Sequence, residues 1–340
     1  MSSMASQQSI RSIVRRSTLS SGDKLNVLTF CTHERYEQNL CRTGHNFYSI
    51  NHGKTWNRDF GKIPSNYEEC DVAPWHINFD LILCHTSCER MSLAKQLQSL
   101  FNIPILRHTH VLPDIRFNVQ EQVSGFNSIP VDHNSFISGY NMQQWGNYKN
   151  NTTSVIEHGV DVDFWVSGEK LDRENVLLSV VNQWPDRDWC CGWNLWKETV
   201  GFQSPHAMPV RVLGDSPGLS KPADSIESLR DAYKSSSIFL NTSIHSPVPT
   251  VLMEAMASGC AVVSTNNCMI PEIIEHGQNG LLADTADELR ASCQYLLDNP
   301  SKARELGEAA KKTMQDKFNL QRFVDDWNGL FFNVIDNYRK

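Results

Sequence analysis

The feature that most constrains this sequence is an apolar helix placed between two prolines and a buried strand. Pro247 and Pro249 favour an extended lead-in, and the spacing predicts a short helix over residues 251–257. Gly259 ends that helix, because glycine tolerates the conformation found just past a helix C-terminus. The next run, Ala261-Val262-Val263, has the apolar, β-branched pattern of a strand buried in a parallel sheet. Loop, helix and strand in this order are typical of an α/β layer.

One carboxylate, Glu254, interrupts this apolar helix. A charge among apolar neighbours is costly unless a polar group meets it. Glu254 is therefore either a ligand-binding residue or an ordinary helix carboxylate that faces solvent. The loop over residues 246–250 opens the helix, where backbone N–H groups and the helix dipole favour an anion. We favour a binding role for this segment.

Length and composition limit the classes of protein. The chain has 340 residues, which is too many for one ordinary core and sufficient for two domains. A net charge of −7 argues against bulk non-specific binding of nucleic acid, which depends on a basic surface. No apolar run reaches about 18 residues, so we expect no membrane span. Residues 1–23 are rich in Ser and Arg without an apolar core, which predicts a disordered tail rather than a secretory signal.

The ten cysteines are scattered, and no C-x2-C pair occurs, so the sequence does not indicate a zinc ribbon. Cys31, Cys84 and Cys260 lie in apolar, strand-like runs, where a reduced thiol acts as a small hydrophobe. This usage indicates a reducing, cytoplasmic compartment.

Strands and helices alternate twice along the chain. In the first half, strands are expected over 25–31, 47–50, 79–84, 103–110 and 154–161, helices over 32–40 and 90–101, and a strand-to-helix passage over 134–140. In the second half, strands are expected over 175–181, 210–214 and 237–240, and helices over 225–235, 287–297, 301–312 and 320–338, with Ser301 as an N-cap. Two tandem alternations predict two doubly wound α/β domains that face a cleft, with ligands at the carboxyl ends of strands.

Three motifs then follow one another at fixed distances. They are Glu254-Ala255-Met256-Ala257-Ser258-Gly259-Cys260-Ala261-Val262-Val263, Pro271-Glu272-Ile273-Ile274 and Gly277-Gln278-Asn279-Gly280-Leu281. Together they resemble the donor-binding region of retaining glycosyltransferases of the GT-B fold, family 4 type, also known as glycosyltransferases group 1. Residues 155–164 resemble the interdomain strand and turn of that family. The resemblance covers roughly residues 130–330 well, and the N-terminal half only by strand order and by two histidines.

The resemblance implies two Rossmann-like domains and a reaction. An acceptor domain would span residues 24–160, a nucleotide-sugar donor domain 161–320, and a final helix over 321–340 would cross back onto the first domain. The implied activity is transfer of a sugar, as a hexosyltransferase, from a UDP- or GDP-sugar to a hydroxyl of a glycan, lipid or modified base. The anomeric configuration would be retained. No Asp-x-Asp lies near a strand end, so we expect no catalytic metal and no cofactor beyond the donor.

The resemblance assigns donor-binding roles, and the chain departs from the family at several of them. Glu254 would bind the ribose hydroxyls, and Arg187 would neutralise the diphosphate in a catalytic role. The lead-in loop would meet the sugar and phosphate through Ser246, Pro247, Val248, Pro249 and Thr250. Ser246 stands where the family has a glutamate, Pro247 where it has a glycine, and Cys191 where it has a lysine. Lys197 would substitute for that lysine, and Gly214 completes the donor-binding set.

On the acceptor side, the resemblance assigns His85 and His110, with His110 also in a catalytic role. Histidines at strand ends are also common as ordinary hydrogen-bonding residues. His108 and His110 alternate along one strand, which could suggest zinc, but no acidic or cysteine partner lies nearby in the sequence. We therefore predict no metal there.

The acceptor is left open by the sequence. The N-terminal half contains polar and aromatic residues that suit a sugar, a lipid head group or a flipped base, namely Trp56, Asn57, Arg58, Trp75 and His76. A hydroxymethylated base in DNA, as some viral enzymes of this fold modify, is one alternative. Arg11, Arg15 and Arg16 favour it, and the net charge counts against it. A basic amphipathic helix for a membrane surface is not evident. A sugar-nucleotide-binding or scaffold protein with little turnover is the other alternative, motivated by Ser246 and Cys191. Neither the sugar nor the oligomeric state is predicted.

Overall fold

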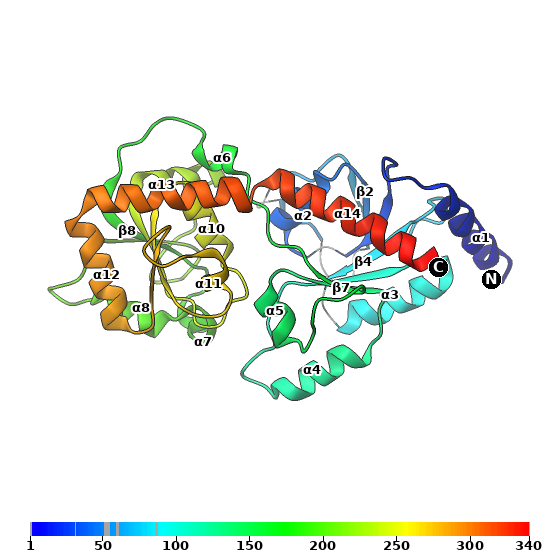
Figure 1. Cartoon of the computed structure of the whole chain (residues 1–340), viewed down its shortest axis with the longest axis horizontal. Helices are drawn as coiled ribbons and strands as arrows, with labels where there is room; N and C mark the ends of the chain where they lie inside the picture. The colour runs from blue at the N-terminus through cyan, green and yellow to red at the C-terminus, as the bar shows by residue number, and fades with distance from the viewer. Residues whose placement is uncertain (1, 31, 51–54, 59–60, 86–87, 340) are drawn as a thin grey trace. The chain divides into compact units, whose positions relative to one another are not determined.

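The computed structural model describes residues 2–30, 32–50, 55–58, 61–85 and 88–339 (Figure 1). Its contacts divide the chain into an N-terminal unit, Met1–Gly159 with Gln321–Lys340, and a C-terminal unit, Val160–Leu320. Each unit is built on its own parallel sheet with helices packed against it, which confirms the predicted α/β class. No helix in the described part of the chain is both long and apolar enough to span a bilayer.

The N-terminal unit contains a seven-stranded sheet in the order β3-β2-β1-β4-β5-β6-β7. Its strands are β1 (Asn26–Thr29), β2 (Asn46–Ile50), β3 (Tyr67–Cys70), β4 (Leu81–His85), β5 (Ile105–Thr109), β6 (His133–Phe136) and β7 (Thr153–Val155). Its helices are α1 (Ser2–Thr18), α2 (Glu34–Cys41), α3 (Cys88–Phe101), α4 (Val119–Ser128), α5 (Gly139–Gln144) and α14 (Leu320–Arg339). The chain leaves β1 toward β3 and returns on the other side at β4, so the strand order reverses between β1 and β4. Ligands of doubly wound folds bind beside such a reversal.

Helix α14 joins the last residues of the chain to the N-terminal unit. Its aromatic side chains Phe323, Trp327 and Phe331 are fully buried. The indole Nε1 of Trp327 donates a hydrogen bond of 3.2 Å to the hydroxyl of Tyr36 on α2. The aromatic, amphipathic pattern of the tail thus becomes part of the first unit's core.

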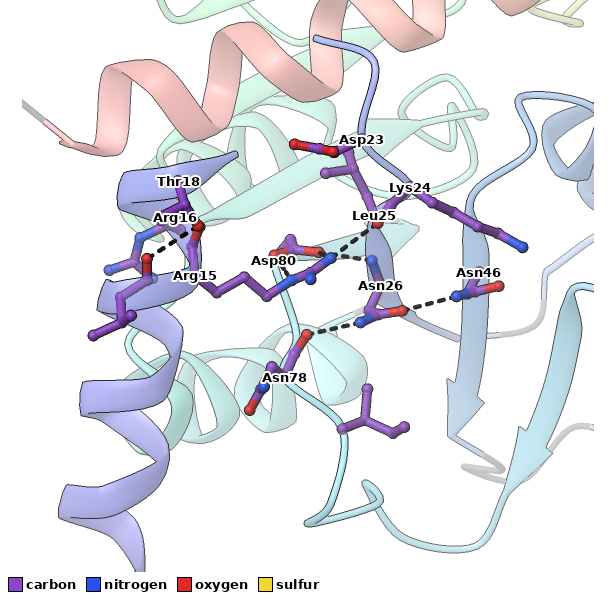
Figure 2. Close-up of polar contacts among 12 residues, drawn as sticks. Arg15, Arg16, Thr18, Asp23, Lys24, Leu25, Asn26, Asn46, Asn78 and Asp80 are labelled. Carbon is purple, nitrogen blue, oxygen red and sulfur yellow. Dashed lines mark hydrogen bonds and ion pairs between the residues drawn. The ribbon is translucent and has the colours of Figure 1, made fainter. Parts of the chain in front are cut away.

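The N-terminal residues form helix α1 and not the disordered tail that their composition predicts. Polar contacts dock this helix, as Figure 2 shows: the guanidinium of Arg15 donates to both carboxylate oxygens of Asp80, at 2.7 and 2.9 Å. Gln8 Nε2 also donates to the carbonyl oxygen of Ile77, at 2.7 Å. A rule based on apolar composition misses this helix because arginine and glutamine make its contacts with the unit.

The C-terminal unit contains a five-stranded parallel sheet in the order β12-β11-β10-β8-β9. Its strands are β8 (Glu174–Val180), β9 (Val210–Leu213), β10 (Ser236–Asn241), β11 (Ala261–Thr265) and β12 (Leu281–Ala283). Its helices are α6 (Val162–Val166), the 3₁₀ helix η2 (Pro185–Arg187), α7 (Asp188–Cys191), α8 (Trp193–Val200), α9 (Ile226–Ser235), α10 (Thr250–Ala257), α11 (Ile270–Ile273), α12 (Ala286–Asp298) and α13 (Pro300–Lys317). The strand order reverses between β8 and β10. The loops that follow these two strands therefore mark the expected ligand side of this unit.

Several details differ from the sequence expectations. Strand β3 lies where the sequence predicted no strand. Its sequence Tyr-Glu-Glu-Cys carries two charges, and it pairs at the edge of the sheet, so it lacks the apolar pattern of a buried strand. Helix α13 begins at Pro300 with Asn299 as N-cap and no side-chain cap, so Ser301 is not its cap. Gly259 follows α10 with φ of 79°, as predicted. Cys84 and Cys260 are buried, and Cys31 lies outside the described residues.

Candidate functional site

In the C-terminal unit, the loops after β8 and β10 are hydrogen-bonded to each other. The carbonyl oxygen of Cys190 accepts from the backbone N–H groups of Ile244, at 2.9 Å, and His245, at 3.1 Å. The hydroxyl of Thr242 donates to the carbonyl oxygen of Gly192, at 3.0 Å. Gly192 has φ of 64°, and a Cβ there would lie 2.0 Å from the carbonyl oxygen of Thr242, so only glycine fits. The two loops that carry the predicted phosphate and sugar ligands therefore lie side by side.

The predicted phosphate ligands differ in their surroundings. Arg187 is exposed at the end of η2, and its Nη1 makes a long contact of 3.4 Å with the carbonyl oxygen of Asn182. Lys197 projects from α8, with its Nζ 5.3 Å from the centre of the Trp193 ring. Cys191, at the position of the family's lysine, is buried in the apolar core. Arg187 is thus the candidate cation with the greatest freedom to meet an anion.

The lead-in loop becomes progressively more buried toward α10. Ser246 and Pro247 are half-buried, Val248 and Pro249 are buried, and Thr250 is exposed. No side chain caps the start of α10. The two amides just before this loop, those of Ile244 and His245, are bound to Cys190, so the loop predicted to meet an anion begins after them.

Glu254 lies on α10 and is only 6% exposed, so the solvent-facing alternative is wrong. Its Oε2 accepts a hydrogen bond of 3.1 Å from the hydroxyl of Tyr233, a fully buried residue of α9. The polar partner that a buried carboxylate needs is therefore present within the unit.

Gly214 follows β9 with φ of 118°. A Cβ at this position would lie 2.1 Å from the carbonyl oxygen of Val181, so the glycine allows the turns after β8 and β9 to approach each other. The structure thus explains Gly214 by backbone packing. Its predicted contact with the donor stays a prediction.

In the N-terminal unit, the two predicted acceptor-side histidines are in direct contact. His85 ends β4, and His110 follows β5, the adjacent strand. The Nδ1 of His85 lies 2.7 Å from the Nε2 of His110. Both residues therefore reach the carboxyl edge of the sheet, where a doubly wound unit binds its ligands.

His108, one pleat before His110, belongs to a separate hydrogen-bond chain inside the unit. Trp327 can only donate, and it donates to the hydroxyl of Tyr36. The Tyr36 hydroxyl also makes a hydrogen bond of 2.8 Å with the Nε2 of His108. The Nδ1 of His108 lies 3.1 Å from the hydroxyl of Ser135, so both ring nitrogens have protein partners. Burial lowers the pKa of His108 and raises that of Tyr36, so both are neutral at physiological pH.

The hydrogen bonds of His108 also bear on the zinc site that its spacing from His110 suggests. Both ring nitrogens of His108 lie at hydrogen-bond distance from protein groups, the hydroxyls of Tyr36 and Ser135. Among the described residues, no group of three or more His, Cys, Asp or Glu side chains is arranged to hold a metal ion.

The histidine cluster contains a residue that the sequence did not single out. Glu37 on α2 is fully buried, and its Oε1 lies 3.3 Å from the Nε2 of His85. No sequence signal marked it, because α2 carries charged residues in a pattern typical of a solvent-exposed helix, and the contact with β4 depends on the tertiary fold. Tyr36 and Trp327 were also missed, because their contacts with the histidines depend on the tertiary fold.

Comparison with known proteins gives the sequence relationship. Residues 222–313 match the model of the family described as glycosyl transferases group 1. N-acetyl-alpha-D-glucosaminyl L-malate synthase of Bacillus anthracis is 31% identical over 87 residues, which are 25% of this chain and 23% of that protein. Trehalose synthase of Rubrobacter xylanophilus is 28% identical over 179 residues, 52% of this chain and 40% of that protein. The chain thus spans less than half the length of these relatives.

Solved structures resemble nearly the whole chain. Anabaena Alr3699/HepE in complex with UDP and glucose matches with a TM-score of 0.69 at 14% identity, covering 91% of this chain and 99% of that chain. Sucrose-phosphate synthase from Thermosynechococcus elongatus matches with a TM-score of 0.68 at 14% identity, covering 91% of this chain and 98% of that chain. The chain therefore has the GT-B fold, as the sequence predicted. The residues that match the glycosyl transferases group 1 model lie within its C-terminal unit.

Proposed function

We propose that this protein is a retaining glycosyltransferase that moves a hexose from a nucleotide-sugar donor to an acceptor hydroxyl. The observation that carries the proposal is the family match over residues 222–313, which includes β10, α10 with Glu254, and β11. The fold supports it, since the similar Anabaena structures are described as complexes with UDP, with UDP and glucose, and with UDP-glucose.

The chemistry of donor cleavage suits the residues of the C-terminal unit. Negative charge grows on the nucleoside diphosphate as its bond to the sugar breaks, and a fixed cation or amide aimed at that charge lowers the barrier. We assign Arg187 and the first turn of α10 to the diphosphate and Glu254 to the ribose hydroxyls. The lead-in loop, with Lys197 and Gly214, would complete the donor site, and the donor would be a UDP- or GDP-sugar with no metal required.

The acceptor side is assigned to His85 and His110 in the N-terminal unit. The acceptor would be a glycan, a lipid or a modified base. The protein would act in a reducing compartment, the cytoplasm. We base that compartment on the scattered cysteines, of which Cys84 and Cys260 are buried in apolar surroundings.

A binding protein without turnover is a second candidate, and two observations favour it. Ser246 replaces a glutamate of the family motif, and Cys191 is buried where the family has a phosphate-binding lysine. Such a protein would bind the nucleotide-sugar through Glu254 and Arg187 and would not transfer the sugar.

A panel of donors and acceptors separates these candidates. UDP-glucose, UDP-N-acetylglucosamine and GDP-mannose would be incubated with sugar, glycolipid and hydroxymethylated-DNA acceptors, and mass spectrometry would detect product. Calorimetry would measure donor binding on the same sample. Transfer to any acceptor supports the enzyme, and the acceptor that reacts identifies the substrate class. Binding without transfer or donor hydrolysis supports the second candidate, and no binding of any donor contradicts both.

A further inference from the structure

The carboxylate of Glu37 is an unusual group in the core of the N-terminal unit. It is fully buried, and neither of its oxygens has a hydrogen-bond partner among the described residues. The polar atom that approaches it is the Nε2 of His85, at 3.3 Å. Native proteins rarely leave a buried carboxylate in this situation, because its desolvation is offset only by a paired cation or by hydrogen bonds.

A charge pair with His85 resolves this situation. If Glu37 is ionised and His85 carries protons on both ring nitrogens, the two charges compensate each other inside the unit. The second proton, on Nδ1 of His85, then points at the Nε2 of His110, 2.7 Å away. An imidazolium can only donate, so His110 must accept at Nε2 and keep its own proton on Nδ1.

The other groups around His110 are consistent with a neutral ring. The Tyr36 and His108 rings pack edge-on against it, with ring centres at 4.5 and 4.4 Å. Burial lowers the pKa of His110, and the positive charges that His108, His85, His158 and His33 can carry lower it further. His110 itself is partly exposed, and no described residue occupies its Nδ1.

We propose that Glu37 is a positioning residue that, through a protonated His85, holds His110 in one neutral tautomer with its Nδ1–H directed to the substrate. The inference rests on the proposed function for the identity of that substrate, an oxygen of the sugar acceptor or donor. A single tautomer presents a hydrogen-bond donor of fixed polarity at the carboxyl edge of the sheet. Without the Glu37 carboxylate, no negative charge would compensate a positive charge on His85. The proton between the two histidines could then lie on either ring.

The direct test is nitrogen NMR of the histidine side chains in the full-length protein at neutral pH. We expect His85 to show two protonated ring nitrogens, and His110 to show a protonated Nδ1 and an unprotonated Nε2. In Glu37→Gln, we expect His85 to show one unprotonated nitrogen and His110 to become a mixture of tautomers. Glu37→Asp keeps the charge and should restore the wild-type pattern.

Glu34→Gln is the matched control. Glu34 lies one turn earlier on the same helix and is 3% exposed, but its Oε1 accepts from the backbone N–H of Asn57, at 3.1 Å. This variant should leave the signals of His85 and His110 unchanged. An unprotonated nitrogen on His85 in the wild-type protein would overturn the inference. So would a Glu37→Gln spectrum identical to that of Glu34→Gln.

An activity measurement separates this inference from the proposed function. Once a transfer reaction is known, Glu37→Gln should lower kcat roughly tenfold without changing the donor KM, as expected when an outer partner of a functional histidine is removed. Equal kcat values for the Glu37→Gln and Glu34→Gln variants would overturn the positioning role. If no transfer is found, the proposed function fails, and the NMR pattern still decides whether Glu37 sets the tautomer of His110.

Discussion

At the scale of single residues, Glu254 shows how one side chain can combine a structural contact with a predicted ligand role. The carboxylate has one oxygen bound to the Tyr233 hydroxyl, which reduces the cost of burying it in an apolar helix. Each carboxylate oxygen can accept more than one hydrogen bond, so Tyr233 does not exhaust its capacity. Glu254 can therefore hold its position through Tyr233 and still accept hydrogen bonds from a pair of ribose hydroxyls.

We expect Glu254→Ala to weaken binding of the nucleotide-sugar by roughly 10- to 100-fold, because hydrogen bonds to a charged group contribute about 1.5–3 kcal/mol each. Isothermal titration calorimetry measures this directly. Tyr233→Phe is the control, since it removes the structural partner and leaves the carboxylate in place. Equal donor affinity in Glu254→Ala and the wild-type protein would contradict the ribose assignment.

Arg187 is expected to act on turnover more than on folding, because it is exposed. Arg187→Ala should lower kcat about 100-fold, the effect of losing one donor of about 3 kcal/mol to a developing negative charge. Arg187→Lys retains the charge and should recover part of the rate. Steady-state kinetics with the reactive donor test this, and a near-normal kcat in Arg187→Ala would mean that another cation meets the diphosphate.

At the scale of elements, helix α1 depends on an ion pair at a buried acid. Asp80 is fully buried, and Arg15 meets both of its oxygens (Figure 2). Burial raises the pKa of Asp80, and the hydrogen bond from Arg15 opposes that rise. Removing Arg15 would leave the acid with its backbone partner, the N–H of Asn26, and with the weaker influence of the Arg16 charge.

We expect Arg15→Ala to reduce the free energy of unfolding of the N-terminal unit by about 3 kcal/mol, the typical cost of removing one member of a buried pair. Arg11→Ala is the control, because Arg11 is exposed on the same helix. Urea denaturation followed by hydrogen exchange measures the change in each unit. A midpoint for Arg15→Ala equal to that for Arg11→Ala would show that the pair contributes nothing.

The elements also show how far the sequence carries a prediction. Strands such as β4, β8 and β11 each contain a short continuous apolar run, so their position follows from the hydrophobic pattern. Helix α1 and strand β3 are held by polar contacts and edge pairing, which leave no periodic signal. The same limit applies to the site. The motif around Glu254 is local and was found, whereas the approach of Glu37 to His85 joins residues 48 positions apart and depends on the tertiary fold.

At the scale of the whole molecule, the histidines whose pKa is lowered all lie in the N-terminal unit. Burial lowers the pKa of His45, His133 and His158 to about 4 each, and it also lowers the pKa of His108 and His110 well below the usual value. The described histidines of the C-terminal unit are His206, His245 and His276, and each is exposed or half-buried. Acid should therefore act differently on the two units.

The sign of the effect follows from proton linkage. Between the unfolded pKa of about 6.5 and the folded pKa of about 4, unfolded histidine binds a proton that buried histidine does not, so stability falls as the pH falls. Each such histidine removes up to about 3 kcal/mol across that window. Hydrogen exchange read by mass spectrometry between pH 7 and pH 4.5, with rates corrected for intrinsic exchange, should show loss of protection in β1, β5 and β6. The sheet of the C-terminal unit should change much less. His133→Gln, which removes one titrating group beside Ser154, should flatten the pH dependence of the N-terminal unit. Equal loss of protection in both units, or an unchanged slope in His133→Gln, would contradict the assignment of acid sensitivity to these buried histidines.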